Sequence, residues 1–343
     1  MTELPEWQTH EAEPSLYTIV MPTFNAASTV RRAVDSVHAQ GCGRWRLIVV
    51  DDGSEDGTAG IVRACSTEDD RVSLLVQDHR GPAEARNAGV AASHTTYVVF
   101  LDADDELEPD YLSAMDEFVT AHPGFDVYHP NLTVVRGDAG RSLFSTRAQA
   151  GSTTFEDLLQ ECVIAVGGAV VNRDLFLRIG GFRSGIHCED YDFWLRAIAQ
   201  GARALYTPSP LYVYHQDVGD RRSEDALAGA EDLVVSLTSL VDEGLVQPQL
   251  RGAVGEAISR RRQHVITVAR EEELAQQAER LKTALDRQFG SRASRVILAV
   301  AHKFTWLTRP LRGMIAGRRK RRSLTSKADS LRGTHAASED DDR

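Results

Sequence analysis

The sequence predicts an α/β protein with a Rossmann-like, mostly parallel sheet flanked by helices and followed by a C-terminal helical extension. Three observations predict this fold. Short apolar runs alternate with helical patterns through the first third of the chain. These runs are predominantly apolar and do not alternate with polar residues, as expected for parallel strands that are covered on both faces. Two of the runs end in acidic clusters, and the carboxyl ends of parallel strands are where such folds bind ligands.

Four apolar runs are expected to form the strands of the sheet. They cover residues 17–22, 46–50, 72–76 and 97–101. A helix is expected over 28–40, because valines recur there at helical spacing and a glycine follows. A second helix is expected over 82–92, where small residues follow a proline at the first position.

The chain is less regular after residue 125. Shorter strands and loops are expected near 166–172, 180–182 and 206–215, with a helix over 189–200. Residues 224–289 are polar and amphipathic, which indicates helices that could also mediate oligomerisation. The expected organisation is a disordered N-terminus at 1–15, one large domain at 16–223, the helical extension at 224–290, a basic segment at 291–322 and a disordered tail at 323–343.

The composition indicates in which cellular compartment the protein functions. The four cysteines are widely spread and form no CxxC pair, which argues against a disulfide framework or a zinc site and favours a reducing compartment. The first residues are acidic and have no apolar core, so a signal peptide is not expected. No apolar run approaches the roughly 20 residues that span a bilayer. We therefore expect a cytoplasmic protein.

Acidic clusters follow the second and fourth expected strands. Asp51 and Asp52 are adjacent carboxylates, which repel each other unless something there binds them. The alternative is an ordinary Asp-Gly-Ser turn, and the residues alone leave both open. Asp102, Asp104 and Asp105 concentrate charge after the fourth strand. Hard divalent cations prefer such oxygen ligands, so this context favours a metal site over an acidic loop or helix cap.

Three other polar sites have a functional and an ordinary interpretation. Arg86 and Asn87 could contact a phosphate or the acidic clusters, or could form a surface ion pair. Glu189 and Asp190 open a helix, where an ionised carboxylate is favoured and could serve as a general base. Spacing alone favours simple helix capping there. His215 ends an expected strand and could bind a metal or phosphate, although a lone histidine at a strand end more often does neither.

Taken together and in order, these motifs resemble the family 2 inverting glycosyltransferases of the GT-A fold. The matching segments are IVMPTFN at 19–25, VVDDGS at 49–54, GPAEARNAG at 81–89, FLDADD at 100–105, GGF at 180–182 and EDYDFWLR at 189–196. The resemblance covers about residues 16–223. It implies a nucleotide-sugar donor, with UDP-sugars favoured, and a glycan, lipid-linked or protein acceptor that offers a hydroxyl group.

The resemblance also implies residue roles. Asp52 would accept a hydrogen bond from the nucleobase. Asp190 would deprotonate the acceptor hydroxyl for a single inverting displacement. The implied donor-binding residues are Pro22, Phe24, Asp51, Asp52, Arg86, Asn87 and Asp102. The implied Mn²⁺ or Mg²⁺ ligands are Asp104, Asp102 and His215. The implied acceptor-side residues are Glu189 and Trp194.

The C-terminal segment predicts a membrane surface as a partner. Residues 291–327 contain eleven Lys or Arg and no Asp or Glu, whereas the whole chain has a net charge of −11. Apolar residues recur at helical spacing within 291–322, which is typical of helices in the membrane interface, and the basic cluster would attract anionic lipid. Docking on the acidic body is the alternative. Nucleic acid is not an expected partner, because the body is acidic.

Other functions are less compatible with the motifs. A nucleotide-sugar pyrophosphorylase would carry a Gly-rich basic loop where this chain has PTFN at 22–25. A phosphatase with an aspartate nucleophile at Asp51 or Asp52 would need a different order of downstream residues. A catalytically degenerate scaffold that only binds nucleotide or membrane is less favoured, because all the acidic motifs are retained.

Overall fold

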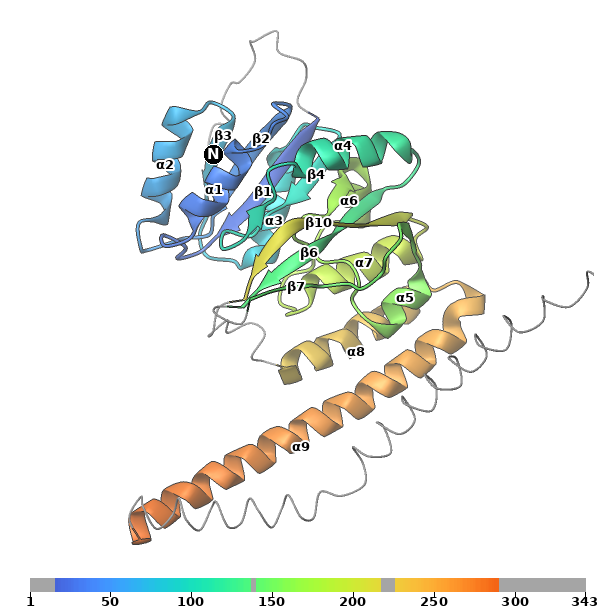
Figure 1. Ribbon diagram of the computed structural model, residues 1–343. Coiled ribbons are helices and arrows are strands. Elements are labelled where there is room, and N and C mark those ends of the chain that lie inside the picture. Colours follow the sequence, from blue (N-terminus) through green and yellow to red (C-terminus); the bar gives the residue numbers. More distant parts are fainter. Residues whose placement is uncertain (1–15, 137–139, 217–225, 290–343) are drawn as a thin grey trace, which may run out of the picture. The chain divides into compact units, whose positions relative to one another are not determined.

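The N-terminal third forms the parallel half of the sheet, as predicted. The computed structural model describes residues 16–136, 140–216 and 226–289. Strands pair in the parallel order β3-β2-β1-β4 (Figure 1). Their bounds are Tyr17–Thr23 for β1, Trp45–Asp51 for β2, Val72–Val76 for β3 and Tyr97–Phe100 for β4. The apolar runs therefore located these strands to within a residue or two.

The second half of the sheet is mixed, so the predicted mostly parallel character holds only for the first half. Strand β9 runs antiparallel between β4 and β6, then β10 runs parallel to β6, and β5 pairs antiparallel with β10. Two short strands, β7 and β8, add to β6 and β10. The bounds are Glu106–Leu107 for β5, Val127–Val135 for β6, Arg141–Leu143 for β7, Gly151–Thr153 for β8, Val170–Asn172 for β9 and Ala204–His215 for β10.

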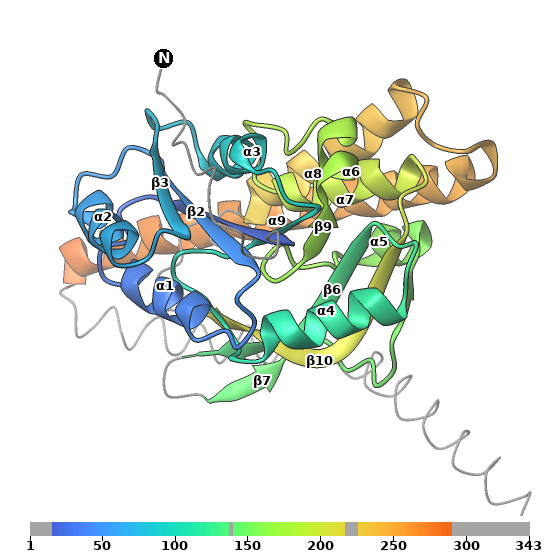
Figure 2. The same ribbon diagram turned by 90° about the horizontal axis from the view of Figure 1, so that it is seen from above.

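Helices cover both faces of the sheet (Figure 2). One face carries α1 (Val30–His38), α2 (Thr58–Glu68) and α4 (Tyr111–Ala121). The other face carries α3 (Pro82–Ala92), α5 (Phe155–Gln160), α6 (Arg173–Ile179) and α7 (Glu189–Ala199). Along β1, Ile19 and Met21 enter one core cluster and Val20 enters the other, because successive side chains of a strand point to opposite faces. This alternation explains why the strands read as continuous apolar runs.

The predicted helical extension begins as part of the body. Helix α8 (Ala226–Asp242) packs against α7 and buries Leu233, Leu237 and Leu240 in the same core cluster as α7. A short 3₁₀ helix (Pro248–Leu250) leads into α9 (Arg251–Phe289). The compact body extends to Val268, and the part of α9 from Ala269 onward belongs to a second unit. The apolar face of α8 is therefore used inside the chain.

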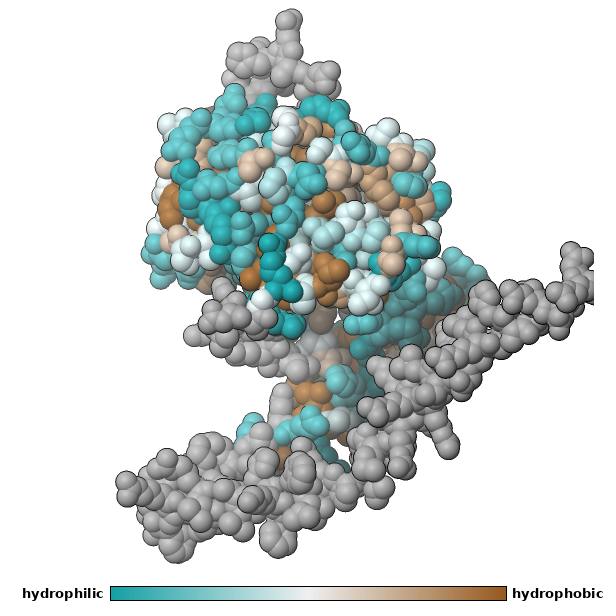
Figure 3. Space-filling view, viewed as in Figure 1, coloured by the Kyte–Doolittle hydropathy of each residue, from teal (hydrophilic) through white to brown (hydrophobic). Residues whose placement is uncertain are grey.

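The described surface is mixed in character. On the face seen in Figure 3, hydrophobic residues form small separate groups among hydrophilic ones. All four cysteines are free thiols. Within residues 16–136, 140–216 and 226–289, no helix combines the length and apolar character that a bilayer crossing needs. The segments expected at 1–15, 291–322 and 323–343 lie outside the described residues.

Candidate active site

A hollow of about 700 Å³ opens at the carboxyl ends of β1 and β4. This is the edge at which open α/β sheets bind ligands. We call it the donor hollow. Among the residues that line it are seven of the predicted site residues, namely Pro22, Phe24, Arg86, Asp102, Asp104, Glu189 and Asp190. The fold thus brings together motifs that are spread over much of the chain.

Asp51 and Asp52 do not line the donor hollow. They are almost fully buried and bind neighbouring loops. Asp51 accepts hydrogen bonds from the Thr23 hydroxyl at 3.3 Å and from a backbone N–H in the following turn at 3.4 Å. Asp52 accepts from the backbone N–H groups of Arg80 and Gly81 at 2.9 and 2.8 Å. Asp51 therefore bonds within the predicted Asp-Gly-Ser turn, whereas Asp52 bonds a separate loop that includes Arg80 and Gly81.

The loop that Asp52 organises also reaches Phe24 at the mouth of the hollow. The ring of His79 lies 2.9 Å from Asp52 through Nδ1 and stacks on the ring of Phe24, with 4.1 Å between ring centroids. Phe24 is 47% exposed, which is unusual for a large apolar side chain after a buried strand. Asp52 thus acts on the hollow indirectly, by fixing a loop whose aromatic ring stacks against a lining residue.

The three carboxylates after β4 separate into different environments. Asp102 lines the donor hollow and pairs with Arg86 at 2.6 Å. Asp104 also lines it, and its carbonyl accepts a hydrogen bond from the Arg32 guanidinium. Asp105 is buried and accepts from the Tyr212 hydroxyl at 2.7 Å. Burial raises the pKa of Asp105 to about 8, and the neighbouring charge of Asp102 adds to the shift.

Arg86 connects the two sides of the hollow. Its side chain is 5% exposed and donates to Asp102 at 2.6 Å and to Glu189 at 2.8 Å. Burial alone would lower the pKa of Arg86, but the charges of Asp102 and Glu189 raise it above the ordinary value. The predicted contact between Arg86 and the acidic clusters is therefore present, and it links the end of β4 to the start of α7.

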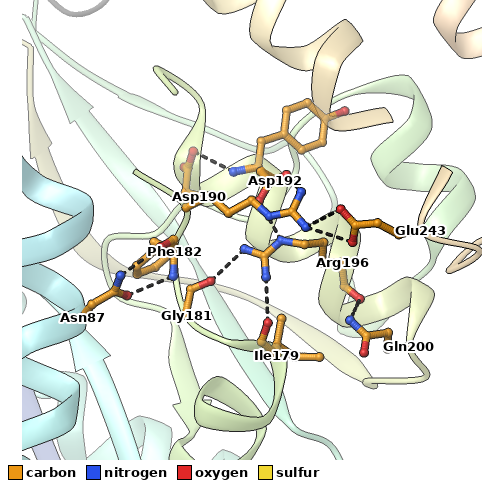
Figure 4. A network of polar contacts seen from close by, with 11 residues as sticks. Asn87, Ile179, Gly181, Phe182, Asp190, Asp192, Arg196, Gln200 and Glu243 are labelled. Carbon is orange, nitrogen blue, oxygen red and sulfur yellow. Dashed lines mark hydrogen bonds and ion pairs between the residues drawn. The ribbon is translucent and has the colours of Figure 1, made fainter. Parts of the chain in front are cut away.

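Asn87 holds the GGF turn in place. Its side-chain amide donates to the Phe182 carbonyl at 2.8 Å and accepts from the Phe182 N–H at 2.9 Å (Figure 4). Gly181 adopts a φ of +69°, and an added Cβ would lie 2.5 Å from the Asn87 amide oxygen. Only glycine fits this contact without strain. Asn87 therefore positions the turn between α6 and α7 and does not line the donor hollow.

Asp190 lies in the first turn of α7 and is half-buried. It lines the donor hollow and also a second hollow of about 440 Å³. Burial raises the pKa of Asp190 to about 6, the charge of Glu189 raises it further, and Arg86 opposes the shift. A carboxyl group whose pKa lies just below neutrality is ionised at pH 7 and retains basicity, which suits a general base.

The second hollow, which we call the acceptor hollow, adjoins the first. Asp102, Val166, Asp190 and Tyr214 line both. The rest of its lining is largely apolar and aromatic, with Leu132, Val134, Phe144, Ile164, Ala165 and Tyr212 among its residues. Aromatic and apolar walls with a few polar groups are typical of sites for small organic ligands. Sequence reasoning missed this hollow, because its walls come from β6, β10 and a loop that carry no motif.

Two predicted site residues lie elsewhere. Trp194 is fully buried in the core, with 0% of its surface exposed to solvent, and it lines neither hollow. It lies one helical turn beyond Asp190, where α7 is covered by other core residues. The ring of His215 binds Glu106 through Nε2 at 2.7 Å and lines a different surface hollow beside α1. His215 does not line the donor hollow with Asp102 and Asp104.

The residues present fit a divalent cation that shares its ligands with a substrate. Among the described residues, no three His, Cys, Asp or Glu side chains form a metal-binding group by themselves. Mg²⁺ typically takes only one or two carboxylates and completes its shell with water and substrate phosphates. Asp102 and Asp104 offer two carboxylates on the wall of one hollow. Their chemistry therefore matches such a cation bound together with a diphosphate.

His187 is a lining residue that sequence reasoning missed. It stands two residues before Glu189, lines the donor hollow and is 46% exposed. Its position just before the acidic pair could have drawn attention to it. However, a histidine in a loop carries no periodic signal, and its neighbour in space lies 45 residues further along the chain.

Comparisons with known proteins agree with this architecture. Residues 18–179 match the family model described as glycosyl transferase family 2. The succinoglycan biosynthesis protein ExoO of Rhizobium meliloti (strain 1021) is 34% identical over 220 residues, which are 58% of this chain and 60% of that protein. The chain spans about 60% of the length of the curated relatives ExoO, ExoU and EpsH that it matches.

Solved structures show the same fold at low sequence identity. S. aureus TarS 1–349 in complex with UDP-GlcNAc has a TM-score of 0.54 and 20% identity, and the match covers 64% of this chain and 66% of that chain. The mannosyltransferase PcManGT from Pyrobaculum calidifontis in complex with GDP-Man and Mn²⁺ has a TM-score of 0.53 and 20% identity, and covers 86% and 88%. Residues 18–179 therefore match glycosyl transferase family 2, and the body has the GT-A fold.

Proposed function

We propose that this protein is an inverting glycosyltransferase that moves a sugar from a nucleotide-sugar donor, with UDP-sugars favoured, to a hydroxyl acceptor. The observation that carries the proposal is the position of Asp190 on the wall shared by the donor and acceptor hollows. TarS with UDP-GlcNAc and PcManGT with GDP-Man support a nucleotide-sugar in the first hollow. The similarity to a succinoglycan biosynthesis protein supports a role in cell-envelope or surface glycan synthesis.

The proposed reaction is one displacement. Asp190 accepts the proton of the acceptor hydroxyl while the hydroxyl oxygen bonds to the anomeric carbon of the donor sugar. The bond from that carbon to the diphosphate oxygen breaks, and the nucleoside diphosphate leaves with the bonding electrons. Attack and departure occur on opposite faces, so the configuration inverts. A base on the acceptor side and charge neutralisation on the leaving-group side are what this displacement needs.

Asp102 and Asp104 would hold Mn²⁺ or Mg²⁺ against the diphosphate. When bound, such an ion neutralises charge on the leaving diphosphate. Arg86 holds Asp102 in place and also binds Glu189, which precedes the proposed base. The hydrogen bond from the Arg32 guanidinium to the Asp104 carbonyl fixes the backbone that presents the second carboxylate. These contacts would organise the donor side before any substrate arrives.

The cellular setting follows from the acceptor and from the basic segment. We propose a glycan, lipid-linked or protein acceptor at the cytoplasmic face of the cell membrane. Residues 291–322 would attach the protein to anionic lipid. Flotation of the full chain with anionic liposomes, compared with a chain that ends at residue 290, tests this attachment. Equal flotation of the two would exclude it.

Asp104→Ala is expected to abolish most metal-dependent turnover. We would measure donor binding and hydrolysis over a panel of nucleotide-sugars, with and without Mn²⁺ or Mg²⁺. Losing one of two direct carboxylate ligands should weaken the metal effect by at least about 10- to 100-fold, the range seen when only an outer partner of a metal ligand is lost. Asp110→Ala is the control, because Asp110 is exposed and does not line the donor hollow. If the wild-type protein binds no donor under any metal condition, the scaffold interpretation replaces the transferase.

The activity should depend on the ionisation of Asp190. Its pKa is raised to about 6 by burial, and only the ionised form can accept a proton. The value of kcat/KM should therefore be constant near neutral pH and fall tenfold for each pH unit below about 6. A pH profile measured at saturating metal checks this. If kcat/KM instead falls only below about pH 4, the ordinary range of an exposed aspartate, Asp190 is not the base.

A further inference from the structure

The segment between the GGF turn and α7 is held by α8. The backbone N–H of His187 donates to Asp232 Oδ2 at 2.6 Å, and the ring Nδ1 of His187 lies 3.0 Å from the same oxygen. The Cys188 thiol lies 3.5 Å from the carbonyl of Gly229, one turn earlier in α8. Arg183 donates to both carboxylate oxygens of Glu243, at 2.7 and 2.9 Å (Figure 4). Glu243 directly follows the end of α8. Helix α8 and the residue that follows it therefore contact both ends of this segment.

This segment also forms part of the donor hollow. Among the lining residues that the structure describes, the basic side chains are those of Arg86 and His187. Arg86 is buried and already pairs with two carboxylates. His187 is 46% exposed, and with Nδ1 engaged by Asp232 its Nε2 is the ring nitrogen available to a ligand. An anionic diphosphate that enters between Asp102, Asp104 and Asp190 therefore meets one accessible basic group on this wall.

We propose that His187 contacts the diphosphate of the donor and that Asp232 is the positioning residue that orients it. A ring that donates from Nδ1 to a carboxylate can, when protonated, donate from Nε2 to a phosphate oxygen, because the partner of one nitrogen fixes the role of the other. A second hydrogen bond, from the His187 backbone N–H to the same Asp232 oxygen, fixes the position of the backbone that carries the ring. The inference rests on the proposed function, and it makes α8 a part of the active site.

A purely structural role for Asp232 predicts a different pattern. The apolar residues Leu233, Leu237 and Leu240 already anchor α8 in the core. The Asp232 side chain is partly exposed, at 21%, so its removal should leave the helix docked. Loss of Asp232 should therefore act on donor use more than on folding, and it should act through His187.

The test compares full-length His187→Ala, Asp232→Ala, Asp232→Asn and the double alanine variant. The control is Glu231→Ala, which removes the exposed neighbouring carboxylate on the same helix. We would measure kcat and KM for the donor that wild type uses, in hydrolysis and in transfer, and the melting temperature of each variant. Loss of one charge-assisted hydrogen bond should lower kcat/KM about 10- to 100-fold in both single alanine variants, mainly through a higher donor KM.

Non-additivity is the decisive result. In the His187→Ala background, Asp232→Ala should have no further effect on kcat/KM, because coupled residues fail to add. Asp232→Asn keeps an acceptor oxygen but removes its charge, so its kcat/KM should lie between those of wild type and Asp232→Ala. Melting temperatures should match that of Glu231→Ala, whose activity should equal wild type.

The contrary results are equally specific. If Asp232→Ala lowers kcat/KM by the same factor with and without His187, or lowers the melting temperature in proportion, Asp232 only supports the fold and the inference is overturned. Unchanged donor kinetics in His187→Ala, with an active wild type, also overturn it while the proposed function stands. If the wild type neither binds nor turns over any donor, the proposed function fails, and this inference fails with it.

Discussion

Asp190→Asn is expected to reduce sugar transfer by about 10³-fold, within the 10²–10⁴ range that a positioned general base supplies. Asparagine has nearly the same shape but cannot accept the acceptor proton. Asp190 Oδ1 accepts a hydrogen bond from the N–H of Tyr191, and the asparagine oxygen can keep that bond, so α7 should remain intact. The loss should therefore appear in kcat.

The measurement is transfer to acceptor under saturating donor and metal, with donor affinity determined separately by calorimetry. Donor affinity should stay within a few-fold of wild type, because Asp190 is proposed to act on the acceptor. Asp174→Asn is a matched control, since Asp174 is also a first-turn carboxylate of a helix but is exposed and lines neither hollow. A comparable loss in both variants, or a loss confined to donor affinity, would remove Asp190 from the role of base.

The parallel half of the fold was predictable because its signal is local. Strand β3 and helix α3 have the bounds that apolar runs and Pro82 predict. The second half was not, since β9 and β6 take their directions from pairing with distant strands. The short helices α5 and α6 were also missed. Segments of six or seven residues show too little of a helical period to be distinguished from loops.

The sequence located the acidic motifs but not the direction of each side chain. Asp102 and Asp105 are three residues apart, yet the first lines the donor hollow and the second is buried against β10. Asp190 and Trp194 are one turn apart, and only Asp190 lies at the open end of α7. Whether a polar side chain faces a ligand or a backbone N–H depends on loops that have no periodicity.

Arg86 illustrates what tertiary structure adds to the mechanism. A surface ion pair was a serious alternative for this residue, but its guanidinium is buried between Asp102 and Glu189. The same cation therefore touches the proposed metal side and the residue next to the proposed base. Breaking a buried ion pair leaves an uncompensated charge. Loss of Arg86 is therefore expected to weaken both donor binding and the proton transfer to Asp190.

Arg196→Met should have the largest effect on stability, with about 3–5 kcal/mol lost from the free energy of unfolding, the usual cost of breaking a buried ion pair from one side. Arg196 is 3% exposed and binds Asp192 at 2.7 Å. It also donates to the carbonyls of Ile179 and Gly181 at 2.9 and 2.7 Å (Figure 4). Methionine fills a similar volume but leaves a buried carboxylate and two carbonyls without these donors.

Chemical denaturation of Arg196→Met, beside Arg178→Met as an exposed control, measures this loss. The control should change the free energy of unfolding by less than about 0.5 kcal/mol, as surface substitutions usually do. A change below about 1 kcal/mol in Arg196→Met would mean that Arg183, 3.6 Å from Asp192, moves in to replace the lost cation. Because Arg196 fixes the GGF turn to α7, the expected loss would also show that the helix presenting Asp190 owes its position to this buried network rather than to apolar packing alone.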